Sequence, residues 1–308
     1  MGRLPPAEKL PLSVRKNVRD EWESNKPDLE NQLSELLSEA WTIDINPSAI
    51  WPYHNDGYAK DSLGSCIKAY VEGVQWQLKS IINKYGDDVK SEINTICHAR
   101  VITLDYDEEK RFSYCGCDVA DGKLRIFFAD GYLGTNIDDA AAESNLFPAL
   151  NAAPSDKPLS FIARTGIRQD WDPEAAGIQK QLAEILNKPD FKVTPNFEDI
   201  FKKLETATKK GGSGIREDWQ SVLGSYVLKY FEGAVYQLKY QKFNEDDMLQ
   251  EGFNEAVEKG EIAVRIVDEL ESGYCECKIE DGVLYLQCTA ENFGVNIDDA
   301  AAKIMDLL

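Results

Sequence analysis

Apolar residues recur with helical spacing in the early part of the chain. In DLENQLSELLSEAW (28–41), leucines at positions 29, 33, 36 and 37 fall on one face of a helix. The segment SLGSCIKAYVEGVQWQLKSII (62–82) has the length of a helix and also keeps its apolar residues on one face. We predict a helix in both places. Close packing against another backbone would explain why the second helix contains Gly73.

The pattern then changes to one typical of strands. VITLDYD (101–107), RFSYCGCDV (111–119) and KLRIFFAD (123–130) predict three strands. Asp121-Gly122 lies between the last two and is a strong hairpin signal, because these residues accept the positive φ angles of a tight turn. We expect an antiparallel three-stranded meander that is followed by a closing helix.

The whole pattern is written twice, 160 residues apart. GSCIKAYVEGVQWQLKS (64–80) aligns with GSYVLKYFEGAVYQLKY (224–240), and YCGCDVADGKLRI (114–126) aligns with YCECKIEDGVLYL (274–286). Two copies of this length indicate a tandem duplication of a small α+β domain with N-terminal helices. We expect a tail over 1–12, a first repeat over 13–148, a linker over 149–163 and a second repeat over 164–308.

Each copy contains the stretch NIDDAAA, which begins at Asn136 and at Asn296. Asparagine is a good N-cap, and the two aspartates would then lie in the first turn of a helix, where the helix dipole favours negative charge. Alanine favours helix and allows close packing. We therefore interpret the motif as architecture and not as a catalytic site.

Charge narrows the classes of partner. The chain has 54 Asp and Glu against 34 Lys and Arg, a net charge of −20 that both halves share. Such a surface repels phosphate backbones, so nucleic acid and anionic membranes are not expected partners. The sequence lacks the apolar run of about 18 residues that a membrane helix needs, and its N-terminus lacks the apolar core of a signal peptide. We expect a cytoplasmic protein whose seven cysteines are mostly free thiols.

Two Cys-x-Cys pairs are weak candidates for a metal or redox site. They are Cys115 with Cys117 and Cys275 with Cys277. Residues i and i+2 of a strand point to the same face, so each pair would present two sulfurs together. Zinc ligands more often lie on turns at Cys-x2-4-Cys spacing, and buried cysteines are ordinary small hydrophobes. We therefore expect no cofactor and no metal.

Motifs for catalysis are missing from the sequence. The two histidines, His54 and His98, both lie in the first repeat, which argues against a duplicated histidine-based site. The sequence has no phosphate-binding glycine loop, His-Glu-x-x-His motif or Gly-x-Ser-x-Gly motif. A hydrolase or isomerase that uses carboxylates in an inter-domain cleft is an alternative, with catalytic residues that the sequence does not identify.

The segment IWPYHNDGY (50–58) is a loop rich in aromatic residues, and we consider it a candidate binding loop. Its candidate residues are Trp51, Tyr53, His54 and Tyr58. Trp and Tyr dominate binding hot spots, although such rings also pack the cores of small domains. Our first hypothesis is a non-catalytic interaction or ligand-binding protein that acts through aromatic loops and an acidic surface. Its partner would be a protein or an apolar small ligand, and a homodimer is compatible with the sequence.

Overall fold

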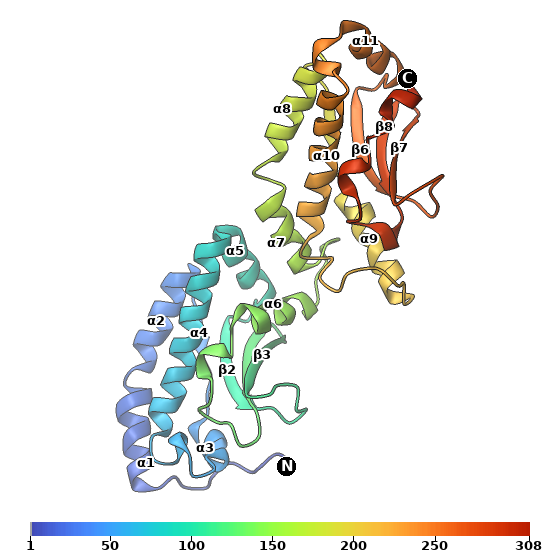
Figure 1. Ribbon diagram of the computed structural model, residues 1–308. Coiled ribbons are helices and arrows are strands. Elements are labelled where there is room, and N and C mark those ends of the chain that lie inside the picture. Colours follow the sequence, from blue (N-terminus) through green and yellow to red (C-terminus); the bar gives the residue numbers. More distant parts are fainter. Residues whose placement is uncertain (1) are drawn as a thin grey trace. The chain divides into compact units, whose positions relative to one another are not determined.

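A computed structural model describes residues 2–308 and shows two compact units, residues 1–156 and 157–308 (Figure 1). Each unit combines helices with a four-stranded sheet. The mixed α+β class that we expected from the sequence is confirmed. The boundary between the units falls between Asp156 and Lys157, in an irregular segment that joins two helices.

The first unit begins with helices and continues with strands. Its helices are α1 (Leu12–Asn17), which runs into a π-helical turn (Val18–Glu23), then α2 (Lys26–Leu37), α3 (Pro47–Ile50), α4 (Leu63–Tyr85), α5 (Asp87–Ile96) and, after the sheet, α6 (Glu143–Ala152). Its strands are β1 (Thr42–Ile43), β2 (Val101–Tyr106), β3 (Cys115–Ala120) and β4 (Lys123–Phe128). The helices that the sequence predicted correspond to α2 and α4.

The second unit follows a closely related order. Its helices are α7 (Phe161–Asp170), α8 (Ala175–Ile185), α9 (Phe197–Lys209), α10 (Leu223–Tyr240) and α11 (Asp247–Ala256). Its strands are β5 (Lys192–Thr194), β6 (Glu261–Ile266), β7 (Cys275–Glu280) and β8 (Val283–Cys288). In each unit the long helix, α4 or α10, lies beside the sheet (Figure 1).

The predicted meander is wrong in its strand order, although the hairpin within it is confirmed. β3 and β4 pair antiparallel around Asp121-Gly122, whose φ angles are +51° and +68°. β2, however, pairs with β4 and in parallel, so the order is β1-β2-β4-β3. The second unit has the equivalent order, β5-β6-β8-β7, with Ile262 opposite Leu284 where the first has Ile102 opposite Leu124. The duplication itself stays a prediction.

The apolar content of the strands explains this order. β4 (KLRIFF) is the more apolar strand of the hairpin, and four of its six residues are buried. A strand with parallel neighbours needs cover on both faces, so the most apolar strand belongs in the centre. β3 (CGCDVA) contains Gly116 and the charged Asp118 and lies at the edge. The meander prediction failed because the strand that follows β2 in the chain, β3, does not pair with β2. The chain after β2 runs to the edge of the sheet, and β4 takes the place between β2 and β3.

NIDDAAA does not begin with a helix cap, so that part of our interpretation is also wrong. Residues Ile137–Asp139 and Ile297–Asp299 form single 3-10 turns. Asn136 and Asn296 adopt the left-handed conformation, with φ of +51° each, and neither side chain caps the turn. Asparagine suits these positions because it tolerates positive φ. A closing helix, α6, forms only from Glu143 in the first unit, and a short turn (Ile304–Leu307) follows in the second.

Among residues 2–308, the structure contains no helix with the length and apolar character needed to cross a bilayer.

Candidate functional site

The NIDDAAA turn is fixed against the long helix of its unit through a glycine. A β-carbon on Gly73 would lie 3.0 Å from Asp138 Oδ1 and 3.3 Å from Asp138 Cα. On Gly233 it would lie 2.9 Å from Asp298 Cα, which is closer than real β-carbons approach other atoms. The close packing predicted for Gly73 is therefore confirmed, and the backbone that it meets belongs to the NIDDAAA motif.

A hydrogen bond from the next turn of the helix strengthens this contact. Gln77 Nε2 donates to the carbonyl oxygen of Asp138 at 2.7 Å, and Gln237 Nε2 donates to that of Asp298 at 3.2 Å. The alanines that follow the aspartates, Ala140 and Ala300, are buried, whereas the aspartate side chains are exposed. The turn therefore presents two carboxylates from a backbone that is held in place.

The first cysteine of each Cys-x-Cys pair donates a hydrogen bond to the backbone of the same turn. Cys115 Sγ donates to the carbonyl oxygen of Asn136 at 3.0 Å, and Cys275 Sγ donates to that of Asn296 at the same distance. A thiol must be protonated to donate in this way. These two cysteines therefore connect the edge strand to the NIDDAAA turn in both units.

Their environment keeps these thiols protonated. Burial, together with the charges of Asp139 and Asp138, raises the pKa of Cys115 to about 12. Burial also raises the pKa values of Cys275 and Cys277 to about 11 and that of Cys117 above its usual range. Metal ions and oxidants react with the thiolate. No group of three or more His, Cys, Asp or Glu side chains within residues 2–308 is placed to hold a metal ion, so the metal or redox alternative gains no support.

Each unit has a cavity between the NIDDAAA turn and the loop that precedes the edge strand. In the first unit it measures about 480 Å³ and is lined by Arg111, Phe112, Ser113, Tyr114, Cys115, Asn136, Asp139, Ala142, Ser144 and Asn145. In the second it measures about 510 Å³. Eight of those ten positions, shifted by 160 residues, also line the second cavity. Cavities of this size suit small ligands or single side chains.

The predicted binding loop divides into buried and exposed rings. Tyr53 is buried and stacks on Tyr106 at 4.5 Å between ring centres, and its hydroxyl accepts a hydrogen bond from Leu4 N. Trp51 and His54 are half-buried and pack against each other at 4.8 Å. Tyr58 is exposed. The structure therefore gives Tyr53 a packing role and does not bring the four residues together as one surface.

The sequence interpretation missed a pair of exposed rings on the long helices. Trp76 and Tyr236 occupy the same position of α4 and α10, and each is 61% exposed. Helix spacing could have found them, because Val74 and Leu78 define the buried face of α4 and position 76 points away from it. Residues 73 and 77 of that helix contact the NIDDAAA turn, so Trp76 lies next to the turn along the helix surface.

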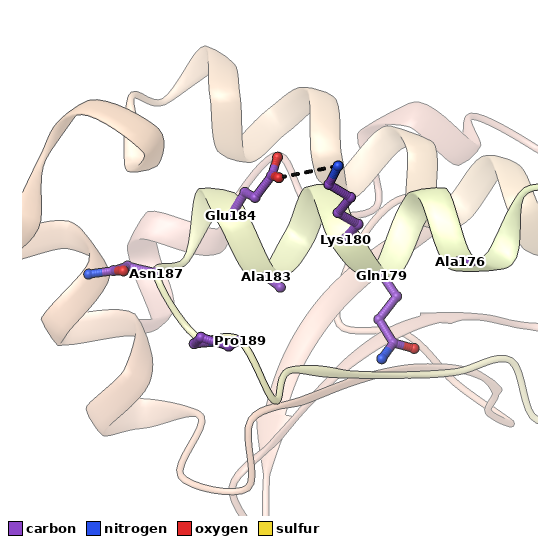
Figure 2. Close-up of a pocket in the computed structure, with 7 residues that line it drawn as sticks. All are labelled: Ala176, Gln179, Lys180, Ala183, Glu184, Asn187 and Pro189. Carbon is purple, nitrogen blue, oxygen red and sulfur yellow. Dashed lines mark ion pairs between the residues drawn. The ribbon is translucent and has the colours of Figure 1, made fainter.

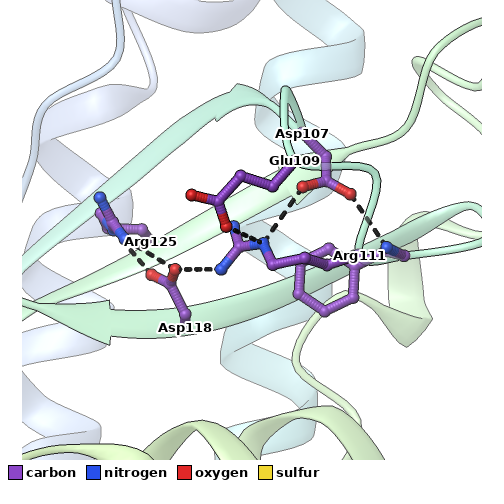
Figure 3. Close-up of polar contacts among 6 residues, drawn as sticks. Asp107, Glu109, Arg111, Asp118 and Arg125 are labelled. Carbon is purple, nitrogen blue, oxygen red and sulfur yellow. Dashed lines mark hydrogen bonds and ion pairs between the residues drawn. The ribbon is translucent and has the colours of Figure 1, made fainter.

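The first unit also has an ion-pair network on its sheet (Figure 3). Asp118 accepts from Arg125 Nε and from Arg111, at 2.6 Å each. Arg111 also pairs with Glu109 and with the buried Asp107, which accepts from the Phe112 backbone at 2.9 Å. The second unit has Val267, Glu271, Lys278 and Tyr285 at the positions of Asp107, Arg111, Asp118 and Arg125. The network is therefore specific to the first unit.

A further hollow of about 590 Å³ runs along α8 (Figure 2). Ala183 and Gln179 line it, and Lys180 pairs with Glu184 at its border. Upstream of the long helices, VRDEWESNKPDLENQLSELL (18–37) aligns with IRQDWDPEAAGIQKQLAEIL (167–186) at an offset of 149, which places Glu30 and Ser34 opposite Gln179 and Ala183. Glu30 and Ser34 accept hydrogen bonds from the backbone N–H groups of Ile43 and Trp41. Ala183 cannot form such a bond, and we assign the hollow no function.

Comparison with known proteins adds no relative: no family model, no curated protein and no solved structure matches this chain.

Proposed function

We propose that this chain is a non-catalytic interaction protein that binds a protein partner through one face in each unit. The observation that carries the proposal is the pair of exposed rings, Trp76 and Tyr236, at the same position of the two long helices. We define the aromatic face as each ring together with the exposed aspartates of the neighbouring turn. These aspartates are Asp138 and Asp139 in the first unit and Asp298 and Asp299 in the second.

The physical character of this face favours binding over catalysis. An exposed Trp offers a large apolar surface with few rotatable bonds, and Trp and Tyr are enriched at binding hot spots. The backbone beneath the aspartates is fixed by Gly73 and Gln77, so little conformational freedom remains to be lost when a partner docks. A partner that brings basic side chains to these carboxylates would match the net charge of −20.

Affinity purification from the protein's own cells tests the proposal. We expect proteins captured by the wild-type chain to be lost with the double variant Trp76→Ala/Tyr236→Ala. Met248→Ala is the matched control, because Met248 is 75% exposed on α11 and is not one of the residues that define the aromatic face. Equal capture by all three chains would contradict the proposal. The same variants, compared by mass in solution, distinguish a partner protein from a second copy of this chain.

A further inference from the structure

The two cavities share their position and size but differ in charge. The charged residues that line the first are Asp139 and Arg111, one of each sign. The second is lined by the acidic residues Glu271, Glu276, Asp299 and Asp306 against a single base, Lys303. We call the second the acidic cavity. Electrostatic attraction should therefore select a cation in the second unit and not in the first.

Apolar residues form part of the other walls of the acidic cavity, beside the polar Ser272 and Asn296. Its lining includes Cys275, Cys277, Ala300 and Ala302, and Tyr274 at its border is 53% exposed. A cation with an aliphatic stem can place the stem against such a floor while its charge stays at the border. A guanidinium group can in addition stack on a tyrosine ring and bond to carboxylates in a planar, bidentate manner.

Several side chains that line the acidic cavity already form hydrogen bonds within the protein. Glu276 accepts from Gln287 Nε2 at 2.7 Å and from the backbone of Glu271 at 3.2 Å, so that carboxylate shapes the loop. Lys303 Nζ lies 3.4 Å from Ser272 Oγ. Asp299 belongs to the NIDDAAA turn, which Gly233 and Cys275 hold from two sides. Glu271 Oε1 lies 3.6 Å from Lys278 Nζ, but the Glu271 side chain is 80% exposed and this surface pair is weak, so the carboxylate can turn to a ligand. The side chains best placed to meet a ligand are therefore those of Tyr274, Asp299 and Glu271.

We propose that the acidic cavity binds an arginine side chain of the partner protein. This inference rests on the proposed function, since it identifies the group of the partner that the second unit recognises. The cavity of the first unit, with equivalent walls and no excess of negative charge, serves as an internal control.

The chain of residues 1–308 should be titrated with N-acetyl-arginine amide and followed through its backbone amide NMR signals. We expect saturable shifts in residues 271–277 and 296–307, and binding about tenfold weaker or more at residues 111–115 and 136–145. N-acetyl-citrulline amide has nearly the same shape without the charge and should cause no saturable shifts. Equal binding in both units, or equal binding of the citrulline compound, would overturn the proposal.

Variants then test the named residues. Glu271→Gln/Asp299→Asn should weaken binding of the arginine compound by about tenfold, whereas Glu269→Gln, the same chemical change two residues from Glu271, should leave it unchanged. An unaltered amide spectrum away from the cavity shows that each variant is folded. Undiminished binding by the double variant would contradict the assignment.

The same variants separate this inference from the proposed function. If a captured partner is lost with Trp76→Ala/Tyr236→Ala but retained with Glu271→Gln/Asp299→Asn, the aromatic face is supported and the arginine site is wrong. If the arginine compound binds but no partner depends on the exposed rings, the proposed function is wrong.

Discussion

At the residue scale, two glycines allow the NIDDAAA turns to pack against the long helices. Gly73 and Gly233 stand inside helices, where glycine is costly, and the space that a side chain would need is taken by an aspartate. The sequence could predict that these glycines are tightly packed, because both copies have one at the same place. The sequence could not show that the aspartates of the NIDDAAA turn pack against these glycines, because that contact depends on where the chain after the last strand meets the long helix.

Replacing one of these glycines should destabilise the protein. We expect Gly233→Ala to lower the free energy of unfolding by about 1–3 kcal/mol, because the new β-carbon would lie 2.9 Å from Asp298 Cα and force the backbone apart. Gly177→Ala, in α8 with no atom within 4 Å, should instead raise it by about 0.5–1 kcal/mol. Denaturant unfolding measures both, and changes of the same sign would contradict this account.

The buried thiols predict how stability depends on alkaline pH. Burial raises the pKa values of Cys66, Cys97 and Cys288 from 9.0 to about 12. Between these pH values the unfolded chain loses protons that the folded chain keeps. The contribution of these thiols to the free energy of unfolding is therefore complete below pH 9 and is lost as the pH rises towards 12. The loss is at most about 1.4 kcal/mol per pH unit for each thiol.

Urea unfolding at pH 8, 10 and 11 measures this fall. We expect the transition midpoint to decrease steadily, and Cys66→Ala/Cys97→Ala to decrease less steeply, because two of the contributing thiols are gone. A midpoint that stays constant from pH 8 to 11 would rule out this explanation.

At the scale of elements, the hairpin could be predicted and its place in the sheet could not. Asp121-Gly122 is a local signal that depends on two residues. Whether β3 or β4 lies next to β2 depends on the loop 107–114 and on which strand is better covered. The parallel pair β2–β4 and the short strand β1 follow from these long-range choices, so alternation within each strand does not reveal them.

The ion-pair network should stabilise the edge of the first sheet. Burial tends to raise the pKa of the Asp118 carboxyl, but hydrogen bonds from Arg125 and Arg111 outweigh it and hold this pKa below its ordinary value. Asp118→Asn should therefore cost about 1–3 kcal/mol at pH 7. The loss should disappear at acid pH, because a lowered pKa contributes stability above the ordinary value and loses it as the pH falls through the folded value.

Lys278→Gln is the matched control for this change. Lys278 occupies the equivalent position of β7, its side chain is 47% exposed, and it lies 3.6 Å from Glu271. We expect it to alter the free energy of unfolding by less than about 0.5 kcal/mol. Equal effects of the two substitutions in thermal or denaturant unfolding would show that the network contributes nothing special.

At the scale of the whole molecule, the two units have separate cores. Residues 154–158 between them are exposed and have no regular structure. Limited digestion with subtilisin should therefore cut first in this segment and leave two stable fragments. Trypsin is less suitable, because Pro158 follows Lys157. Mass spectrometry locates the cut, and a first cut within either core would contradict the boundary.

The candidate site shows what sequence comparison within one chain can and cannot supply. The repeat identified the NIDDAAA turn, the Cys-x-Cys pairs and the long helix as shared features. The cavities appear only when the loop, the edge strand and the turn meet in space. The charge difference between them, Arg111 against Glu271, was visible in the sequence and had no meaning until both residues were placed in equivalent walls.

The strand order described above also bears on aggregation. LRIFF in β4 is a short apolar, β-prone segment of the kind that stacks into fibrils when its edge is free. Here both of its edges are occupied, by β2 and β3. The edge strands β3 and β7 contain Asp118 and Lys278, charged residues of the kind that discourages a second molecule from extending the sheet at that edge. Because the hairpin is placed with β4 inside and β3 at the edge, the fibril-prone segment is covered on both sides in the folded protein.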